Sequence, residues 1–288
     1  MKIDKELKLK VIGAGNVGMS IIEAFAQQGF NVVGIEINEE VIKRGTARVE
    51  KSLEKLVAKG KLPAEEKETI LSRIQMTTDF EAMNDAEVVI EAIYEDMGIK
   101  KDLFKQMDNK VESDDALLLT NTSSLSISEI AAVTKRPDKV AGMHFFNPVP
   151  VMKLVEVIQG VGTSTDTINK VTELAKLMRK VPIICKDSPG FVVNRLFHML
   201  IVEACKIVEE GVASAKDVDT GTKLGLGHPM GPFEVVDFLD SLPLFEKVCE
   251  YLESELGSRF KVPVWVKNYN RAGRTGRSCG KGFYDYTQ

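Results

Sequence analysis

The sequence predicts an α/β fold with a mostly parallel sheet, followed by an all-α domain. A glycine-rich loop at residues 13–18 stands between a strand-like apolar run and a helical pattern. Strand and helix patterns alternate from there to residue 184, which is typical of parallel sheets. Strand signals become rare after Asp187, so we expect an α/β domain over residues 1–187 and a helical domain over residues 188–288.

Composition and charge narrow the class of protein. A hydrophobic content of 44% with 28% charged residues is ordinary for a soluble globular protein. The formal net charge of −4 argues against a nucleic-acid partner, which usually needs a strongly basic face. The four cysteines form no C-x-x-C pair, which predicts a reduced setting without structural zinc. With no signal-peptide pattern and no apolar run of bilayer length, we expect a cytoplasmic protein without a membrane partner.

The first elements predict a βαβ unit. Residues 7–12 and 31–36 are short β-prone runs, and residues 19–28 between them have apolar side chains at helical spacing. A crossover of this kind makes the two strands parallel, as in Rossmann-type domains.

Two charged amphipathic helices at residues 39–61 and 63–73 follow, joined at Gly60, and we interpret them as a helical hairpin inserted into the sheet. Further strands are predicted at residues 87–91, 117–120, 139–143, 151–158 and 181–184, with helices near residues 99–108, 126–133 and 166–179. In the second domain we expect helices at about residues 191–209, 215–224, 232–239 and 242–256. An apolar helical domain of this kind often forms a dimer interface, so we expect a homodimer.

The loop Gly13-Ala14-Gly15-Asn16-Val17-Gly18 meets the context that a dinucleotide-binding fingerprint requires. A strand precedes it, a helix follows it, and an acidic residue ends the second strand. Gly13 permits the tight turn, Gly15 lets the backbone approach a pyrophosphate, and Gly18 lets the helix pack close to the sheet. The helix N-terminus then offers N–H groups to the phosphates.

Glu36, at the end of the second strand, favours NAD over NADP. Its carboxylate would accept hydrogen bonds from the adenosine ribose and repel a 2′-phosphate, and no Lys or Arg follows until Lys43. Two alternatives remain open at this point: FAD as the dinucleotide, and a glycine-rich turn of some other α/β fold.

A Ser, a His and a Glu are predicted to meet at the same edge of the sheet. His144 ends one predicted strand, Ser123 follows the end of the preceding one, and Glu156 lies among apolar residues of the next. Ligands of open α/β sheets bind beyond the carboxyl ends of the strands. A buried carboxylate needs a partner, and pairing with Glu156 would favour the imidazolium formed when His144 takes up a proton.

Each of these residues also has a purely structural interpretation. His144 alone could be a structural hydrogen-bonding group, and Glu156 could face solvent at a sheet edge. Ser123 with Asn121 could cap the next helix, as could Ser126 or Ser128. Of the other histidines, His198 is expected in the core and His228 in a loop. The joint occurrence of the three side chains favours chemistry.

Six motifs together resemble the L-3-hydroxyacyl-CoA dehydrogenase family. They are the runs at residues 121–125, 144–148, 151–157, 187–195, 227–233 and 280–286. The resemblance extends over nearly the whole chain. The length and the single set of motifs resemble the stand-alone bacterial members, the 3-hydroxybutyryl-CoA dehydrogenases.

The resemblance implies roles for residues at matching positions. His144 would be the general base for the 3-hydroxyl proton, held by Glu156, while Ser123 would bind the reacting oxygen and Asn194 the substrate carbonyl. For NAD, the implied contacts beyond the loop are Glu36, Glu95, Lys100, Ser123 and Asn147. For the coenzyme A part of an acyl-CoA substrate they are Ser52, Lys59 and Ser123, of which the first two lie on the inserted hairpin.

The chain departs from the family pattern at a few positions. Glu36 stands where Asp is frequent, which keeps the NAD preference but changes the ribose geometry. Ser278, followed by Cys279, replaces a common Lys, so a contact from that lysine is in doubt. Asp240 replaces an expected Gly in the turn after Leu239.

The function predicted is an NAD-dependent (S)-3-hydroxyacyl-CoA dehydrogenase that interconverts 3-hydroxybutyryl-CoA and acetoacetyl-CoA. One rival is a dehydrogenase of a free hydroxy acid on the same fold, similar to L-gulonate 3-dehydrogenase, which would not need Ser52 and Lys59. The other is a nucleotide-sensing protein without catalysis, which would have no use for the complete set of Ser123, His144, Glu156 and Asn194.

Overall fold

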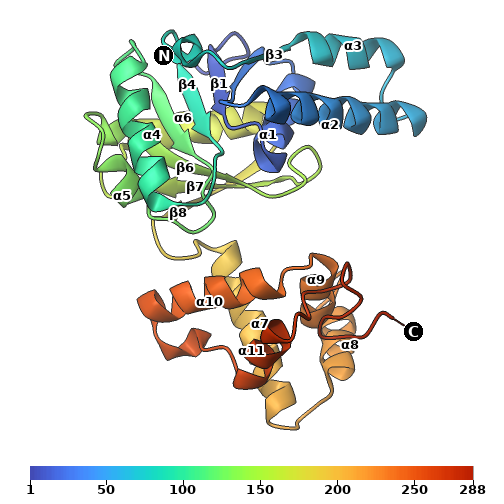
Figure 1. Ribbon diagram of the computed structural model, residues 1–288. Coiled ribbons are helices and arrows are strands. Elements are labelled where there is room, and N and C mark those ends of the chain that lie inside the picture. Colours follow the sequence, from blue (N-terminus) through green and yellow to red (C-terminus); the bar gives the residue numbers. More distant parts are fainter. Residues whose placement is uncertain (288) are drawn as a thin grey trace. The chain divides into compact units, whose positions relative to one another are not determined.

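The computed structural model describes residues 1–287 and separates into two compact units, Met1–Ser188 and Pro189–Gln288. The first unit is an α/β domain and the second is helical (Figure 1). Within the described residues, no helix combines the length and the apolar character needed to cross a membrane.

The first unit is built on one eight-stranded sheet with the order β3-β2-β1-β4-β5-β6-β7-β8. Every neighbouring pair is parallel except β6 and β7, so the prediction of a mostly parallel sheet is confirmed. The strands are β1 (Leu9–Ile12), β2 (Val32–Ile35), β3 (Ile74–Thr77), β4 (Val88–Glu91), β5 (Leu117–Thr120), β6 (Val140–Phe145), β7 (Leu154–Gln159) and β8 (Val181–Lys186).

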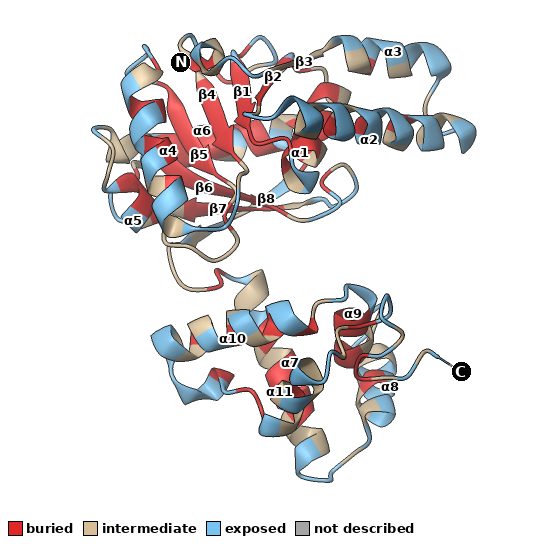
Figure 2. Ribbon diagram, viewed as in Figure 1, coloured by how far each residue is buried: buried red, intermediate tan, exposed pale blue. Residues whose placement is uncertain are grey.

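Helices cover both faces of this sheet. Apolar side chains of α1 (Asn16–Gln27) and α6 (Thr165–Leu177) pack on one face in a single hydrophobic core. On the other face lie α4 (Met97–Lys110) and α5 (Ile127–Ala131) (Figure 1). The predicted hairpin, α2 (Glu39–Ala58) and α3 (Ala64–Ser72), extends away from the sheet, and most of its surface is exposed (Figure 2).

Three details of the predicted α/β domain were wrong. The edge strand β3 was missed, because its sequence Ile-Gln-Met-Thr forms no continuous apolar run and closely follows α3. The strand expected from residue 151 begins at Leu154, since Val151 and Met152 both donate their N–H to the carbonyl of Pro148 in a turn. The helix expected at residues 126–133 is shorter, and Ser126 is its N-cap, accepting a hydrogen bond from the N–H of Glu129.

The second unit packs its helices around a core of its own that includes Phe233, Phe245 and Phe283. Its helices are α7 (Val193–Glu209), α8 (Ala215–Gly225), α9 (Pro232–Phe238), α10 (Leu242–Leu256) and α11 (Val264–Arg271). The last of these was not predicted; it is eight residues long, with Val266 buried and with Trp265 and Tyr269 packed against the core.

Two buried aspartates explain the glycine motifs of this unit. Asp237 accepts hydrogen bonds from the N–H groups of Phe283 and Tyr284, at 2.8 and 2.9 Å. It lies so close that a Cβ on Gly282 would come within 2.0 Å of its carboxylate. Asp219 lies similarly close to Gly231. A Cβ added to that glycine would lie 2.2 Å from an oxygen of the Asp219 carboxylate. Backbone must therefore reach each carboxylate directly, and only glycine allows that approach.

The departures at Asp240 and Ser278 turn out to be linked. Asp240 has a φ of 51°, the left-handed conformation that explains why a glycine is expected there. Its carboxylate accepts a hydrogen bond from the Ser278 N–H at 2.7 Å. That bond offsets part of the backbone cost and joins the turn after α9 to the C-terminal segment.

Candidate active site

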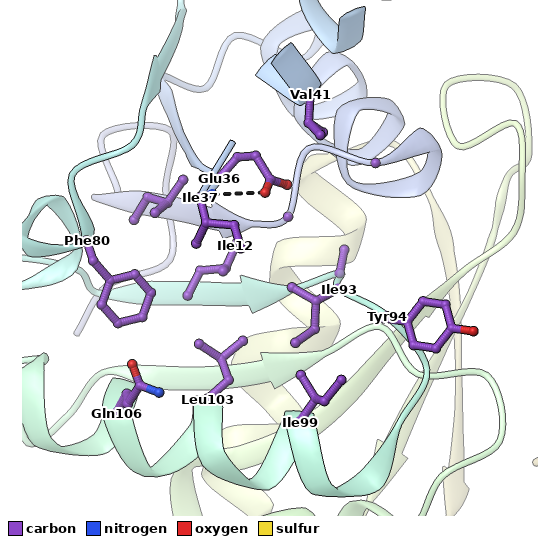
Figure 3. A pocket seen from close by; sticks show the side chains of 14 residues that line it. Ile12, Glu36, Ile37, Val41, Phe80, Ile93, Tyr94, Ile99, Leu103 and Gln106 are labelled. Atoms are coloured by element: carbon purple, nitrogen blue, oxygen red, sulfur yellow. Dashed lines mark hydrogen bonds between the residues drawn. The ribbon is translucent and has the colours of Figure 1, made fainter. Parts of the chain in front are cut away.

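A cavity of about 720 Å³ opens at the carboxyl edge of the sheet, beside the glycine-rich loop (Figure 3). Its walls are mostly apolar, and the side chains of Ile12, Ile93 and Leu103 face one another across it. Glu36 lies at one side and Gln106, from α4, at the other (Figure 3). An apolar cavity with a few polar groups at its rim is typical of a cofactor site.

The glycine loop has the geometry that a dinucleotide needs. Gly13 has a φ of +102°, and a Cβ there would lie 2.5 Å from the Ala92 carbonyl oxygen. A Cβ on Gly18 would lie 1.9 Å from the Gly13 carbonyl oxygen. At Gly15, by contrast, a Cβ would meet no protein atom within 4 Å, and this residue lines the cavity. The residues therefore fit a phosphate-bearing ligand, which would use the space that Gly15 leaves.

Glu36, directly after β2, is hydrogen-bonded to the glycine loop. Its Oε2 accepts a hydrogen bond from the Ala14 N–H at 2.9 Å, and its Oε1 accepts one from the Ile37 N–H at 2.9 Å. Both bonds hold the carboxylate at the cavity wall, where it can receive ribose hydroxyls.

His144 and Glu156 form a buried pair. They are direct cross-strand partners in the antiparallel β6–β7 ladder, and His144 Nδ1 lies 2.7 Å from Glu156 Oε2. The side chain of His144 is 8% exposed and that of Glu156 is 0% exposed. A carboxylate in this position orients the ring and stabilises it when it is protonated, so the pair can act as a general acid–base group.

Ser123 follows β5 and is held by Glu95. One oxygen of Glu95 accepts hydrogen bonds from the Thr122 hydroxyl at 2.5 Å, the Ser123 N–H at 3.0 Å and the Ser124 hydroxyl at 3.2 Å. Burial alone would raise the pKa of Glu95, but the charge of Lys100 and the bond from Thr122 outweigh it and lower that pKa below its ordinary value. Glu95 therefore stays ionised and accepts all these bonds.

Lys100 is buried, which its prediction as a cofactor contact did not anticipate. Its side chain is 1% exposed, and Nζ lies 2.5 Å from Glu91 Oε1 and 3.3 Å from Glu95 Oε2. Glu91 ends β4, is 0% exposed, and was missed by the sequence analysis. The signal was available, because Glu91 is an acidic residue at the end of an apolar strand, like Glu36.

The hairpin residues have different surroundings. Ser52, half-buried on α2, donates its hydroxyl to the buried Glu23 of α1 at 2.7 Å. Lys59, the C-cap of α2, is exposed. Both residues lie on the hairpin. The Ser52 hydroxyl is bonded within the domain, whereas the Lys59 side chain presents its charge to solvent.

The remaining predicted residues lie on separate segments. Asn147 is exposed in the turn between β6 and β7, and Asn16 is exposed at the start of α1. Asn194 lies in the first turn of α7, in the second unit, and its carbonyl oxygen is 2.7 Å from His198 Nδ1. As predicted, His198 is buried in a helix and His228 lies in a loop.

Sequence comparison identifies the family. The model of the 3-hydroxyacyl-CoA dehydrogenase NAD-binding domain matches residues 8–188, and the model of the C-terminal domain of the same family matches residues 190–286. This chain belongs to the 3-hydroxyacyl-CoA dehydrogenase family. It is accordingly an oxidoreductase, and the dinucleotide of its glycine loop is NAD.

Similar proteins cover nearly the whole length of the chain. A 3-hydroxybutyryl-CoA dehydrogenase of Clostridioides difficile is 46% identical, over 98% of this chain and 100% of that protein. A probable 3-hydroxybutyryl-CoA dehydrogenase of Bacillus subtilis is 42% identical, over 98% of each chain. Among solved structures, (S)-3-hydroxybutyryl-CoA dehydrogenase PaaH1 from Ralstonia eutropha superposes with a TM-score of 0.94 at 39% identity, covering 98% of this chain and 100% of that one.

Glu36→Gln tests how the cavity selects its cofactor. The amide still accepts the hydrogen bond from Ala14, but it no longer repels a 2′-phosphate. We expect the preference for NADH over NADPH, measured as a ratio of kcat/KM, to fall at least about tenfold. Glu39→Gln, in the exposed first turn of α2, is the matched control and should leave the ratio unchanged. An unchanged ratio in Glu36→Gln would contradict this explanation of selectivity.

Proposed function

We propose that this chain interconverts 3-hydroxybutyryl-CoA and acetoacetyl-CoA with NAD, using His144 as its general acid–base group. The observation that carries the proposal is the buried His144–Glu156 pair at the carboxyl edge of the sheet that also holds the dinucleotide loop. The names of the similar proteins from Clostridioides difficile and Ralstonia eutropha support the substrate.

The proposed steps follow from the pair. Because Nδ1 of His144 is engaged with Glu156, Nε2 is the nitrogen that takes the 3-hydroxyl proton in oxidation and returns it in reduction. Glu156 stabilises the protonated ring, and Ser123 donates a hydrogen bond to the reacting oxygen. Asn194 of the second unit binds the thioester carbonyl. The nicotinamide, when bound, accepts or supplies the hydride.

We also propose that the hairpin binds the coenzyme A part of the substrate. Lys59 would attract the phosphates, and Ser52 would contribute a polar contact beside it. Loop residues Asn16 and Val17, with Gly13, Gly15 and Gly18, would contact NAD, as would Glu36, Glu95 and Asn147. In this arrangement Lys100 acts through its ion pair with Glu95, which holds the Glu95 carboxylate in place.

His144→Gln tests the acid–base assignment. Glutamine keeps a hydrogen-bonding side chain but cannot exchange the proton, so kcat for acetoacetyl-CoA reduction should fall about 10³-fold. Binding of NADH, followed by its fluorescence, should be retained. His228→Gln in the loop is the matched control and should be fully active. Wild-type activity in His144→Gln would refute the role of this residue.

Lys59→Ala tests the coenzyme A contact and separates the proposal from a dehydrogenase of free hydroxy acids. Loss of an exposed cation should raise KM for acetoacetyl-CoA about three- to tenfold with little change in kcat. Free coenzyme A should inhibit the wild type competitively and the variant more weakly. Lys176→Ala, an exposed lysine on α6, is the control. Absence of inhibition by coenzyme A would favour a free hydroxy acid as the substrate.

We further propose a cytoplasmic homodimer that associates through the second unit. Exposed apolar side chains of this unit support the dimer, among them Leu224, Leu226 and Leu244, which are 84%, 64% and 60% exposed. The unpaired state of all four cysteines fits a reducing compartment.

Sedimentation tests the dimer. It should give twice the chain mass for the wild type, and Leu224→Glu combined with Leu226→Glu should give monomers. Val161→Glu, at a position of the first unit that is 95% exposed, should stay dimeric.

A further inference from the structure

Behind the loop that carries Ser123 lies a buried acid that has no assigned role. Glu91, the last residue of β4, is 0% exposed, and its ion-pair partner Lys100 is 1% exposed. Two charges that are fully removed from water pay a large desolvation penalty, and replacing such a pair by neutral groups is often harmless to stability. Stability alone is therefore a poor reason for this pair to exist.

One set of contacts leads from Glu91 through charges to the Ser123 loop. Glu91 Oε1 holds Lys100 Nζ at 2.5 Å, and Nζ lies 3.3 Å from Glu95 Oε2. The other oxygen of Glu95 receives the Ser123 N–H at 3.0 Å and the Thr122 hydroxyl at 2.5 Å. Lys100 is thus held between two carboxylates, one in the core and one under the loop.

A second set of contacts reaches the same loop through neutral groups. The Thr120 hydroxyl donates to Glu91 Oε2 at 2.7 Å, and its oxygen accepts the Thr122 N–H at 3.1 Å. The backbone of Glu91 contributes as well, because its carbonyl accepts the N–H of Asn121 at 2.9 Å. Both oxygens of one buried carboxylate are therefore connected to the segment from residue 121 to residue 124.

We propose that Glu91 is a positioning residue for Ser123, acting through Lys100 and Glu95 on one side and through Thr120 on the other. The proposal rests on the role of Ser123 in the proposed function. Glu91 does not touch substrate; it fixes the backbone of the loop so that the Ser123 hydroxyl is presented to the reacting oxygen. Small displacements of such a group reduce transition-state stabilisation while substrate binding changes little.

The test is a double-mutant cycle between the buried pair and Ser123. Glu91→Gln combined with Lys100→Met removes both charges together, so neither is left alone in the core. We expect kcat for acetoacetyl-CoA reduction to fall about tenfold in this pair variant and about 10²-fold in Ser123→Ala. If the pair acts through Ser123, the variant that combines all three changes should stay within about threefold of Ser123→Ala alone.

A matched control uses another buried pair of the same unit. Asp108 and Arg136 are 3% and 13% exposed and form an ion pair of 2.8 Å at the C-terminal end of α4, away from the Ser123 loop. Asp108→Asn combined with Arg136→Met should lower the unfolding midpoint without lowering kcat at 25 °C. Combined with Ser123→Ala, it should leave the kcat of Ser123→Ala unchanged.

A second variant keeps the test informative if the pair variant folds poorly. Thr120→Val removes the hydroxyl that joins Glu91 to Thr122 without changing size or charge. It should lower kcat about threefold on its own and have no further effect in Ser123→Ala.

The outcomes separate this inference from the proposed function. Multiplicative losses, with kcat about 10³-fold down in the combined variant, would overturn the positioning role while Ser123 kept its place in the reaction. Wild-type kcat in the pair variant would overturn it as well. Wild-type kcat in Ser123→Ala would remove Ser123 from the proposed function, and the inference about Glu91 with it.

Discussion

The reversal of chain direction between β6 and β7 is the constraint on which the candidate site depends. Because β7 runs back along β6, His144 near the carboxyl end of β6 lies directly opposite Glu156, the third residue of β7. The carboxylate can then be fully buried and still paired, at 2.7 Å from the ring. An exposed acid at the sheet edge would be solvated and would hold the imidazole less firmly.

Buried carboxylates recur throughout the molecule, and each is a local solution to the same energetic problem. An ionised acid that leaves water needs several donors or a cation. Glu91 takes a lysine, a hydroxyl and the Ile93 N–H, whereas Asp219 and Asp237 take backbone N–H groups that glycines allow to approach. Some of these donors come from segments distant in sequence, such as Thr120 for Glu91 and Phe283 for Asp237, so these acids also join segments together.

The sequence was sufficient for the parts of this structure that follow from periodicity and local chemistry. The βαβ unit, the glycine loop and the hairpin could be predicted because their signals are contiguous. The strand β3 could not, since its sequence Ile-Gln-Met-Thr is only partly buried and lacks the apolar runs of β2, β4 and β5. The surroundings of Lys100 could not be predicted either, since Glu91 and Glu95 reach it only through the path that the chain takes from β4 into α4. The cross-strand register that joins His144 to Glu156 likewise exists only in the folded sheet.

The hairpin illustrates how a buried acid can also hold a binding element in place. Helix α2 is mostly exposed, with Gly45, Val49 and Leu53 as its buried residues, so its apolar contact with the domain is narrow. Burial raises the pKa of Glu23, against the smaller opposing effects of the bonds from Ser52 and Gln27. Since the ionised form is the costly one, the Ser52 hydroxyl is worth most where Glu23 is charged, above its raised pKa. This hydrogen bond, 2.7 Å long, contributes to holding α2 against α1. Ser52 thus anchors the hairpin, while Lys59, the C-cap of α2, presents its charge to solvent.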